Sequence, residues 1–203
     1  MPMKFSPVPF LSLFMLGACT PGSTGEETTQ TSNKGFEENI SLQGVSFLIQ
    51  CPNQGSINTL TITPSGLEGK NDPIVVEIEG SITNAEVEDL DANGFPEIYV
   101  YVRGAGSGSY GSLIAYACNQ KKSLTPIFLS DLIEDKANSK GYMGHDQFAV
   151  GEGALLRRFP LYHQNDTNSK LSGKPTGKTR QLQYKLKAGE AGWILRLDRT
   201  IDY

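Results

Sequence analysis

Short runs of β-branched and aromatic residues, separated by turn residues, follow one another from residue 44 to the end of the chain. In the clearest run, Leu182, Tyr184 and Leu186 alternate with polar residues and would share one face of a half-buried strand. One short helix is expected at residues 129–136, with Ser130 as its cap. This pattern predicts an all-β fold, an antiparallel β-sandwich of about eight or nine short strands with one short helix. The expected strands are residues 45–51, 58–64, 74–80, 82–90, 97–103, 112–118, 148–162, 179–187 and 193–199.

The N-terminal segment has the pattern of an export signal. Residues 1–18 carry one charge, Lys4, followed by an apolar run that is too short for a stable membrane span. The run ends in Leu16-Gly17-Ala18-Cys19, which resembles the lipobox of bacterial lipoproteins. That resemblance implies cleavage before Cys19, lipidation of Cys19 and, because Thr20 follows, anchoring in the outer membrane on the periplasmic side. The alternative is an ordinary cleaved signal with an unrelated cysteine.

Composition divides the rest of the chain into a tether and one domain. Residues 19–43 are rich in Thr, Ser, Gly and Glu and are expected to form a flexible tether, and residues 44–203 the β-sandwich domain. The formal net charge is −4 and the chain holds no basic run of five or more residues, which argues against a nucleic-acid partner.

Cys51 and Cys118 are the two cysteines of the predicted domain. Export implies an oxidising compartment, in which a disulfide between them is the natural expectation. The alternative is two separate buried thiols.

Residues suited to catalysis are sparse. The chain has two histidines, His145 and His163, and lacks the GxSxG and HExxH motifs and a P-loop lysine. We therefore expect no enzymatic activity and no cofactor. A hydrolase that uses His145 or His163 remains an alternative.

Residues 89–97 place oxygen-bearing side chains at the spacing of a short calcium loop. Asp89, Asp91 and Asn93 would lie on one side of a tight loop, and Glu97 could reach back to them. The same residues fit a β-turn whose acidic groups accept hydrogen bonds from local amides, with Asn93-Gly94 at its bend. The turn is the interpretation that we adopt, with no metal assigned. A calcium-stabilised envelope module that binds glycan or protein is the alternative function.

The stretch from Gly104 to Ser112 holds one aromatic residue, Tyr110, among glycines and serines. It lies between two expected strands and is longer than a hairpin turn requires. Tyrosine offers a large apolar face and a hydroxyl group at low conformational cost, and the small neighbours allow close approach. We therefore expect Ser107, Gly108, Ser109 and Tyr110 to form a projecting loop that binds a protein partner.

Ser107-Gly108-Ser109-Tyr110 fits the S-G-x-Y motif of bacterial lysozyme inhibitors. Residues 89–117, 141–153 and 179–198 together make the chain similar to the periplasmic inhibitors of invertebrate-type (i-type) lysozyme. This resemblance implies a β-sandwich that is not an enzyme, an i-type lysozyme as partner and, as known in that family, a possible homodimer. It also implies that the loop enters the lysozyme cleft, where Ser107 and Tyr110 meet the catalytic site.

Overall fold

The computed structural model describes residues 35–163, 173–190 and 192–203, and all structural statements concern these residues. The predicted signal peptide, Cys19 and the tether up to residue 34 lie outside them. The described chain is built from strands and one 3₁₀ turn, η1, at Leu132–Glu134. None of its helices is long and apolar enough to cross a membrane. The strands are β1 (Phe36–Leu42), β2 (Val45–Cys51), β3 (Ile57–Ser65), β4 (Ile74–Glu79), β5 (Ser81–Glu88), β6 (Glu97–Arg103), β7 (Gly111–Asn119), β8 (Ser123–Leu129), β9 (Gln147–Gly151), β10 (Ala154–Tyr162), β11 (Pro175–Ala188) and β12 (Trp193–Asp202).

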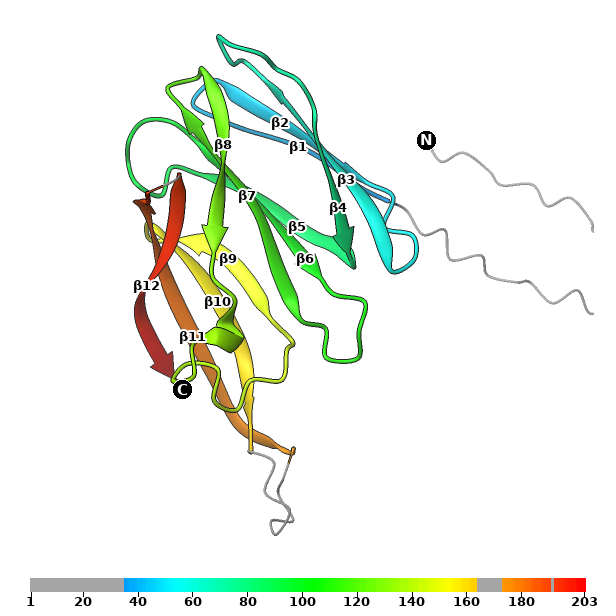
Figure 1. The fold of residues 1–203 in the computed structure, drawn as a ribbon, viewed down its shortest axis with the longest axis vertical. Helices are drawn as coiled ribbons and strands as arrows, with labels where there is room; N and C mark the ends of the chain where they lie inside the picture. Colours follow the sequence, from blue (N-terminus) through cyan, green and yellow to red (C-terminus); the bar gives the residue numbers. More distant parts are fainter. Residues whose placement is uncertain (1–34, 164–172, 191) are drawn as a thin grey trace, which may run out of the picture. The chain divides into compact units, whose positions relative to one another are not determined.

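The first sheet is four-stranded and antiparallel, in the order β1-β2-β3-β4 (Figure 1). Its edge strand β1 lies inside the stretch that composition had assigned to the tether. Phe36 and Ile40 pack against the core, whereas Glu37 and Asn39 are exposed, so the strand alternates like its neighbours. The folded domain therefore begins before residue 44.

The second sheet is eight-stranded, in the order β5-β6-β7-β8-β12-β11-β10-β9. All its pairs are antiparallel except β8 with β12, which run parallel from Ile127↔Trp193 to Leu129↔Leu195. Its two edge strands, β5 and β9, lie close to each other: the Val150 N–H of β9 donates to the Glu86 carboxylate of β5 at 2.9 Å. The sheet therefore curls back on itself.

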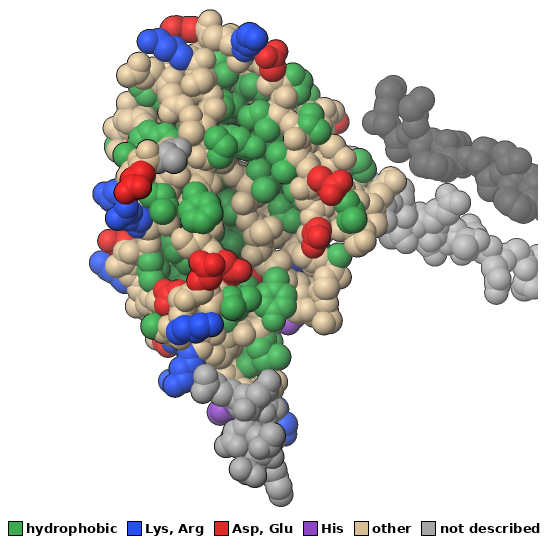
Figure 2. All heavy atoms as spheres, viewed as in Figure 1, with side chains coloured by type: hydrophobic (Ala, Val, Ile, Leu, Met, Phe, Trp, Pro, Cys, Tyr) green, Lys and Arg blue, Asp and Glu red, His purple; other side chains and the backbone are tan. Residues whose placement is uncertain are grey.

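Two apolar clusters make up the core, and β6 contributes to both. Ile98, Val100 and Val102 belong to the cluster between the two sheets, and Tyr99 and Tyr101 to the cluster enclosed by the curled sheet. All β6 residues from Glu97 to Val102 are buried. In the space-filling view, hydrophobic side chains gather in the middle of the upper half of the molecule, where β4, β7 and β8 lie in Figure 1 (Figure 2). The all-β prediction is confirmed, with two sheets packed together.

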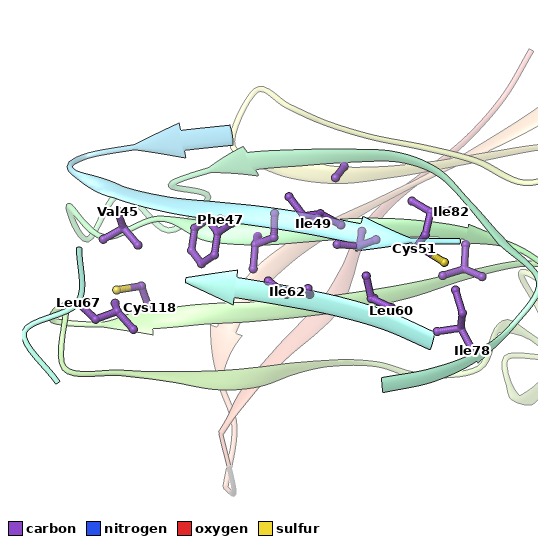
Figure 3. Close-up of a cluster of buried hydrophobic side chains, with 14 residues drawn as sticks. Val45, Phe47, Ile49, Cys51, Leu60, Ile62, Leu67, Ile78, Ile82 and Cys118 are labelled. Atoms are coloured by element: carbon purple, nitrogen blue, oxygen red, sulfur yellow. The ribbon is translucent and has the colours of Figure 1, made fainter. Parts of the chain in front are cut away.

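Cys51 and Cys118 are both buried but are not bonded to each other, so the predicted disulfide is wrong. They lie at opposite ends of the cluster between the sheets, with Cys118 near Val45 at the other end of β2 (Figure 3). Six residue steps separate Val45 from Cys51 along β2, a length of about 20 Å. A disulfide needs α-carbons within roughly 7 Å, so the two thiols are far out of range.

The short helix expected at residues 129–136 is reduced to the turn η1. Its cap is Asp131, not Ser130, and the Asp131 carboxylate accepts the Ile133 N–H at 2.9 Å. The preceding strand β8 had no counterpart among the expected strands. This strand contains Pro126, and a proline within a run of residues argues against predicting a strand there. The parallel pairing of β8 with β12 starts after the proline, at Ile127.

Candidate functional site

The β6–β7 connection, which we call the tyrosine loop (Gly104–Tyr110), holds all four residues of the predicted motif. It lies at the far end of the β5–β6–β7 region from the β5–β6 connection (Figure 1). The Gly104 N–H donates to the Tyr110 carbonyl at 2.9 Å, and the Ser109 N–H donates to the Gly106 carbonyl at 2.9 Å. Ser107 is exposed and the Tyr110 side chain is half exposed, at 48%. The loop is thus a folded turn that presents a hydroxyl group and an aromatic ring.

Gly108 is required by the position of the tyrosine ring. A β-carbon at residue 108 would stand 2.3 Å from Tyr110 Cε2 and 2.8 Å from Cδ2, because the ring folds back over the loop. Real β-carbons do not approach other atoms so closely, so any side chain here would displace the ring. Gly108, between Ser107 and Ser109, therefore permits this direction of the Tyr110 ring.

A second segment, Tyr142–Asp146, holds the tyrosine loop in place, and we call it the bracing segment. The His145 N–H donates to the Gly108 carbonyl at 2.9 Å, and the Asp146 carboxylate accepts the Gly111 N–H at 2.7 Å. Gly144 permits this approach, since its φ is +85° and a β-carbon there would lie 2.0 Å from the Gly108 oxygen. The loop is anchored on both sides of its turn.

A buried ion pair supports the bracing segment from beneath. Arg157 Nε on β10 lies 2.7 Å from Asp146 Oδ1, and the two side chains are 6% and 0% exposed. Asp146 Oδ2 also accepts the Tyr142 hydroxyl at 2.5 Å, and Arg157 Nη2 donates to the Tyr142 oxygen at 2.8 Å. With the Gly111 N–H included, the carboxylate accepts three hydrogen bonds, which offsets the cost of burying it.

Aromatic rings connect Tyr110 to the core of the curled sheet. Its ring meets Tyr142 edge to face at 5.4 Å, and Tyr142 meets Phe159 in the same way at 4.7 Å. The Arg157 guanidinium lies 5.3 Å from the Tyr142 and Phe148 ring centres. Burial raises the pKa of the Tyr142 phenol, so it stays protonated and donates to Asp146. Burial lowers the pKa of Arg157, but the Asp146 carboxylate raises it, and the net shift is upward.

A groove of about 570 Å³ runs beside the tyrosine ring. Tyr110 and Tyr142 line one part of it, and Phe128, Ile133 and Glu134 from the end of β8 and from η1 line another. Phe128 and Ile133 are 60% and 53% exposed. The surface around the loop therefore adds an apolar area with acidic residues at its margin.

The β5–β6 connection, with the first residue of β6, forms a second candidate site, which we call the acidic loop (Asp89–Glu97). The Asp89 carboxylate accepts the N–H groups of Asn93 and Gly94, each at 2.9 Å, and Asp91 accepts the Asn93 N–H at 3.1 Å. These are the local bonds of the turn interpretation. One carboxylate oxygen from each of Asp89, Asp91 and Glu97 also lies within 4.8 Å of the others, as the calcium alternative requires.

Glu97 differs from the other carboxylates because its side chain is completely buried. Its Oε2 accepts the Leu90 N–H at 2.8 Å and lies 3.4 Å from the Tyr99 hydroxyl oxygen, while its Oε1 has no hydrogen-bond partner. Burial, together with the nearby Asp91 and Asp89 carboxylates, raises the pKa of Glu97 to about 8.

Both histidines are exposed. The His145 ring lies 6.4 Å from the Tyr162 ring, and the backbone N–H of His145 holds the tyrosine loop. His163 bonds through its backbone to Lys174 and Gly173. Through these backbone hydrogen bonds both histidines hold neighbouring segments together.

Three residues of the site have no role in the sequence analysis: Tyr142, Asp146 and Arg157. The first two lie in a stretch, 141–153, that was noted only for its resemblance. The sequence did contain a sign of a functional segment for these two residues: Gly141 and Gly144 flank the aromatic Tyr142, just before His145 and Asp146. No local pattern pairs Asp146 with Arg157, because the two lie on different elements.

Comparisons of the chain with protein-family models, with curated proteins and with solved structures find no match.

Proposed function

We propose that this protein inhibits i-type lysozyme by inserting the tyrosine loop into the active-site cleft of the enzyme. The observation that carries the proposal is the exposure of Ser107 and Tyr110 on a loop that is itself held by the bracing segment. The S-G-x-Y motif and the three longer segments of resemblance support it. In this proposal the protein is not an enzyme, and it protects peptidoglycan by blocking the lysozyme that would cleave it.

The chemistry of the loop suits a lysozyme cleft. Such enzymes cleave with two carboxyl groups that flank the glycosidic bond. The hydroxyl groups of Ser107 and Tyr110 are donors to carboxylates, and a hydrogen bond to a charged group contributes about 1.5–3 kcal/mol. The half of the Tyr110 ring that is exposed would become buried in the cleft, as is common for tyrosines that dominate an interface. The loop offers no scissile bond, so the outcome is blockade.

Preorganisation of the loop favours binding. The hydrogen bonds from His145 and to Asp146 fix the turn before a partner arrives, so less conformational entropy is lost on docking. This support does not depend on a disulfide, since Cys51 and Cys118 are not bonded to each other.

Location and assembly complete the proposal. Lipidation of Cys19 would hold the domain at the periplasmic face of the outer membrane, where a lysozyme that enters the envelope would meet it. The protein partner is the lysozyme, with a homodimer as a possible state of the inhibitor.

The test is an assay of peptidoglycan lysis by an i-type lysozyme, with chicken-type and goose-type enzymes alongside. We expect the wild type to inhibit the i-type enzyme and Tyr110→Ala to raise the half-inhibitory concentration roughly 30-fold, from a loss of about 2 kcal/mol. Ser107→Ala should weaken inhibition less, and the double variant more. Tyr203→Ala is the matched control, because Tyr203 is 62% exposed and distant in sequence from the loop. Equal inhibition by the double variant and the wild type would overturn the loop mechanism.

A further inference from the structure

We propose that the acidic loop binds one calcium ion through Asp89, Asp91 and Glu97. The inference is independent of the proposed inhibition of lysozyme. Its starting point is the buried Glu97 carboxylate, whose Oε1 has no hydrogen-bond partner and whose side chain is fully shielded from solvent. A carboxyl oxygen buried without a partner is costly, and a bound ion or water is one of the explanations for such a group in a native protein.

The Glu97 carboxylate, one oxygen of which has no hydrogen-bond partner, belongs to the acidic cluster. Donor oxygens of Glu97, Asp89 and Asp91 lie within 4.8 Å of one another. Two oxygens bound to one calcium ion at 2.3–2.6 Å can be at most about 5 Å apart, so each of these separations is within the limit for a single coordination shell. The hydrogen bonds that Asp89 and Asp91 accept from Asn93 and Gly94 orient the carboxylates and leave lone pairs free.

Among the described residues, no basic side chain forms an ion pair with this cluster. The ion pairs within 4 Å in the described part of the chain join Arg157 to Asp146 and Arg180 to Asp202. The donors that Asp89 meets in the described part of the chain are neutral. One of them is the side-chain amide of Gln43, in the turn between β1 and β2, which donates to Asp89 Oδ2 at 2.7 Å. Three carboxyl groups in close contact, without a cation from the protein, favour a cation from solution.

The donor set selects the class of cation. All donors are oxygens, which suits calcium or magnesium and not the softer metals that prefer sulfur or imidazole. The ligands come from an irregular loop and from the first residue of a strand, and calcium tolerates such geometry, whereas magnesium demands a near-ideal octahedron. The local turn and the metal loop, presented above as alternatives, are therefore compatible, because the turn holds the ligands.

The experiment uses the full-length protein, stripped with EDTA and titrated with CaCl₂ or MgCl₂ at constant ionic strength. By isothermal titration calorimetry we expect saturable binding of one calcium ion with a Kd no weaker than about 1 mM. At 100 times the Kd, calcium should raise the Tm by roughly 5–10 °C, with a smaller effect of magnesium.

Two variants identify the ligands. Glu97→Gln keeps the shape of the buried side chain, and Asp91→Asn keeps the shape of a half-buried turn residue. Each variant should lose most of the calcium response while unfolding cooperatively like the wild type. Glu77→Gln, which changes an exposed carboxylate on β4 outside the cluster, should respond like the wild type. The proposal is overturned if calcium at about 10 mM leaves the wild-type heat signal and Tm unchanged, or if both ligand variants respond fully. An equal response to magnesium would overturn the assignment to calcium.

Discussion

Arg157 Nε lies 2.7 Å from Asp146 Oδ1, and both side chains are almost completely shielded from solvent. A second pair, Arg180 with Asp202, has the same 2.7 Å separation but with side chains 13% and 36% exposed. The two ion pairs therefore differ in burial and not in distance. The exposed pair can serve as the control for measuring how much the buried pair stabilises the fold.

Asp146→Asn should lower the free energy of unfolding by about 3–5 kcal/mol, because it leaves the Arg157 charge buried without a counter-ion. Asp202→Asn should cost about 1 kcal/mol or less, because its pair is partly exposed to water. Urea unfolding of both variants measures the difference. Equal, small effects would show that the buried pair does not support the bracing segment.

Gly108→Ala should disturb the tyrosine loop, because the added methyl group would occupy the space of the Tyr110 ring. We expect inhibition of i-type lysozyme to fall at least roughly tenfold, with the overall stability nearly unchanged, since the loop lies at the surface. Gly106→Ala is the matched control in the same loop, since a β-carbon there meets nothing within 4 Å. The proposed role of the ring direction fails if the two variants inhibit equally well.

Cys51 and Cys118 should behave as separate buried thiols. Neither should react with a thiol reagent in the folded protein, and burial further raises the pKa of Cys118. Both should react fully on denaturation without any reductant, and peptide mapping by mass spectrometry assigns the labels to the two positions. Reductant should leave the Tm unchanged; a fall in the Tm would indicate a disulfide.

Glu97 should make the metal-free protein less stable as the pH rises. Its pKa in the folded protein is about 8, above the ordinary 4.5, so the folded state binds the proton more tightly than the unfolded state. The stabilising effect of the proton is present in full below about pH 4.5 and is lost as the pH rises towards 8, by on the order of 1 kcal/mol per pH unit. Burial and the Asp91 and Asp89 carboxylates raise this pKa, and the hydrogen bonds from the Leu90 N–H and the Tyr99 hydroxyl partly offset the rise.

The measurement is the free energy of unfolding between pH 5 and 8 in EDTA, for the wild type and for Glu97→Gln. Subtracting the variant removes the contributions of the other carboxyl groups, and the difference should grow with pH in favour of the variant. A difference that does not depend on pH would contradict the prediction.

Local patterns in the sequence located most of the strands, and the exceptions have physical causes. The run at residues 97–103 matches β6. Its β-branched and aromatic residues occupy both faces of the strand, as expected for a strand that is buried on both sides. β1 was missed because Glu37, Glu38 and Asn39 make its composition resemble that of a tether. β8 was missed because Pro126 lies inside it, and a proline argues against a strand.

The candidate site was predictable in its exposed part and not in its support. The tyrosine loop was located from its glycines and its single aromatic ring. The buried state of Glu97 was not foreseen, although Tyr99 and Tyr101 follow it on the same face of the strand. The contact of Asp146 with Arg157 depends on the tertiary fold and has no local signature.

Strand β6 joins the acidic loop at Glu97 to the tyrosine loop that follows Arg103. Its six residue steps separate the two by about 20 Å. A lysozyme that binds Tyr110 in its cleft would therefore leave the acidic loop open to solvent. Calcium and the lysozyme would not compete for the same surface. Calcium and lysozyme could then occupy the molecule simultaneously, as a ternary complex.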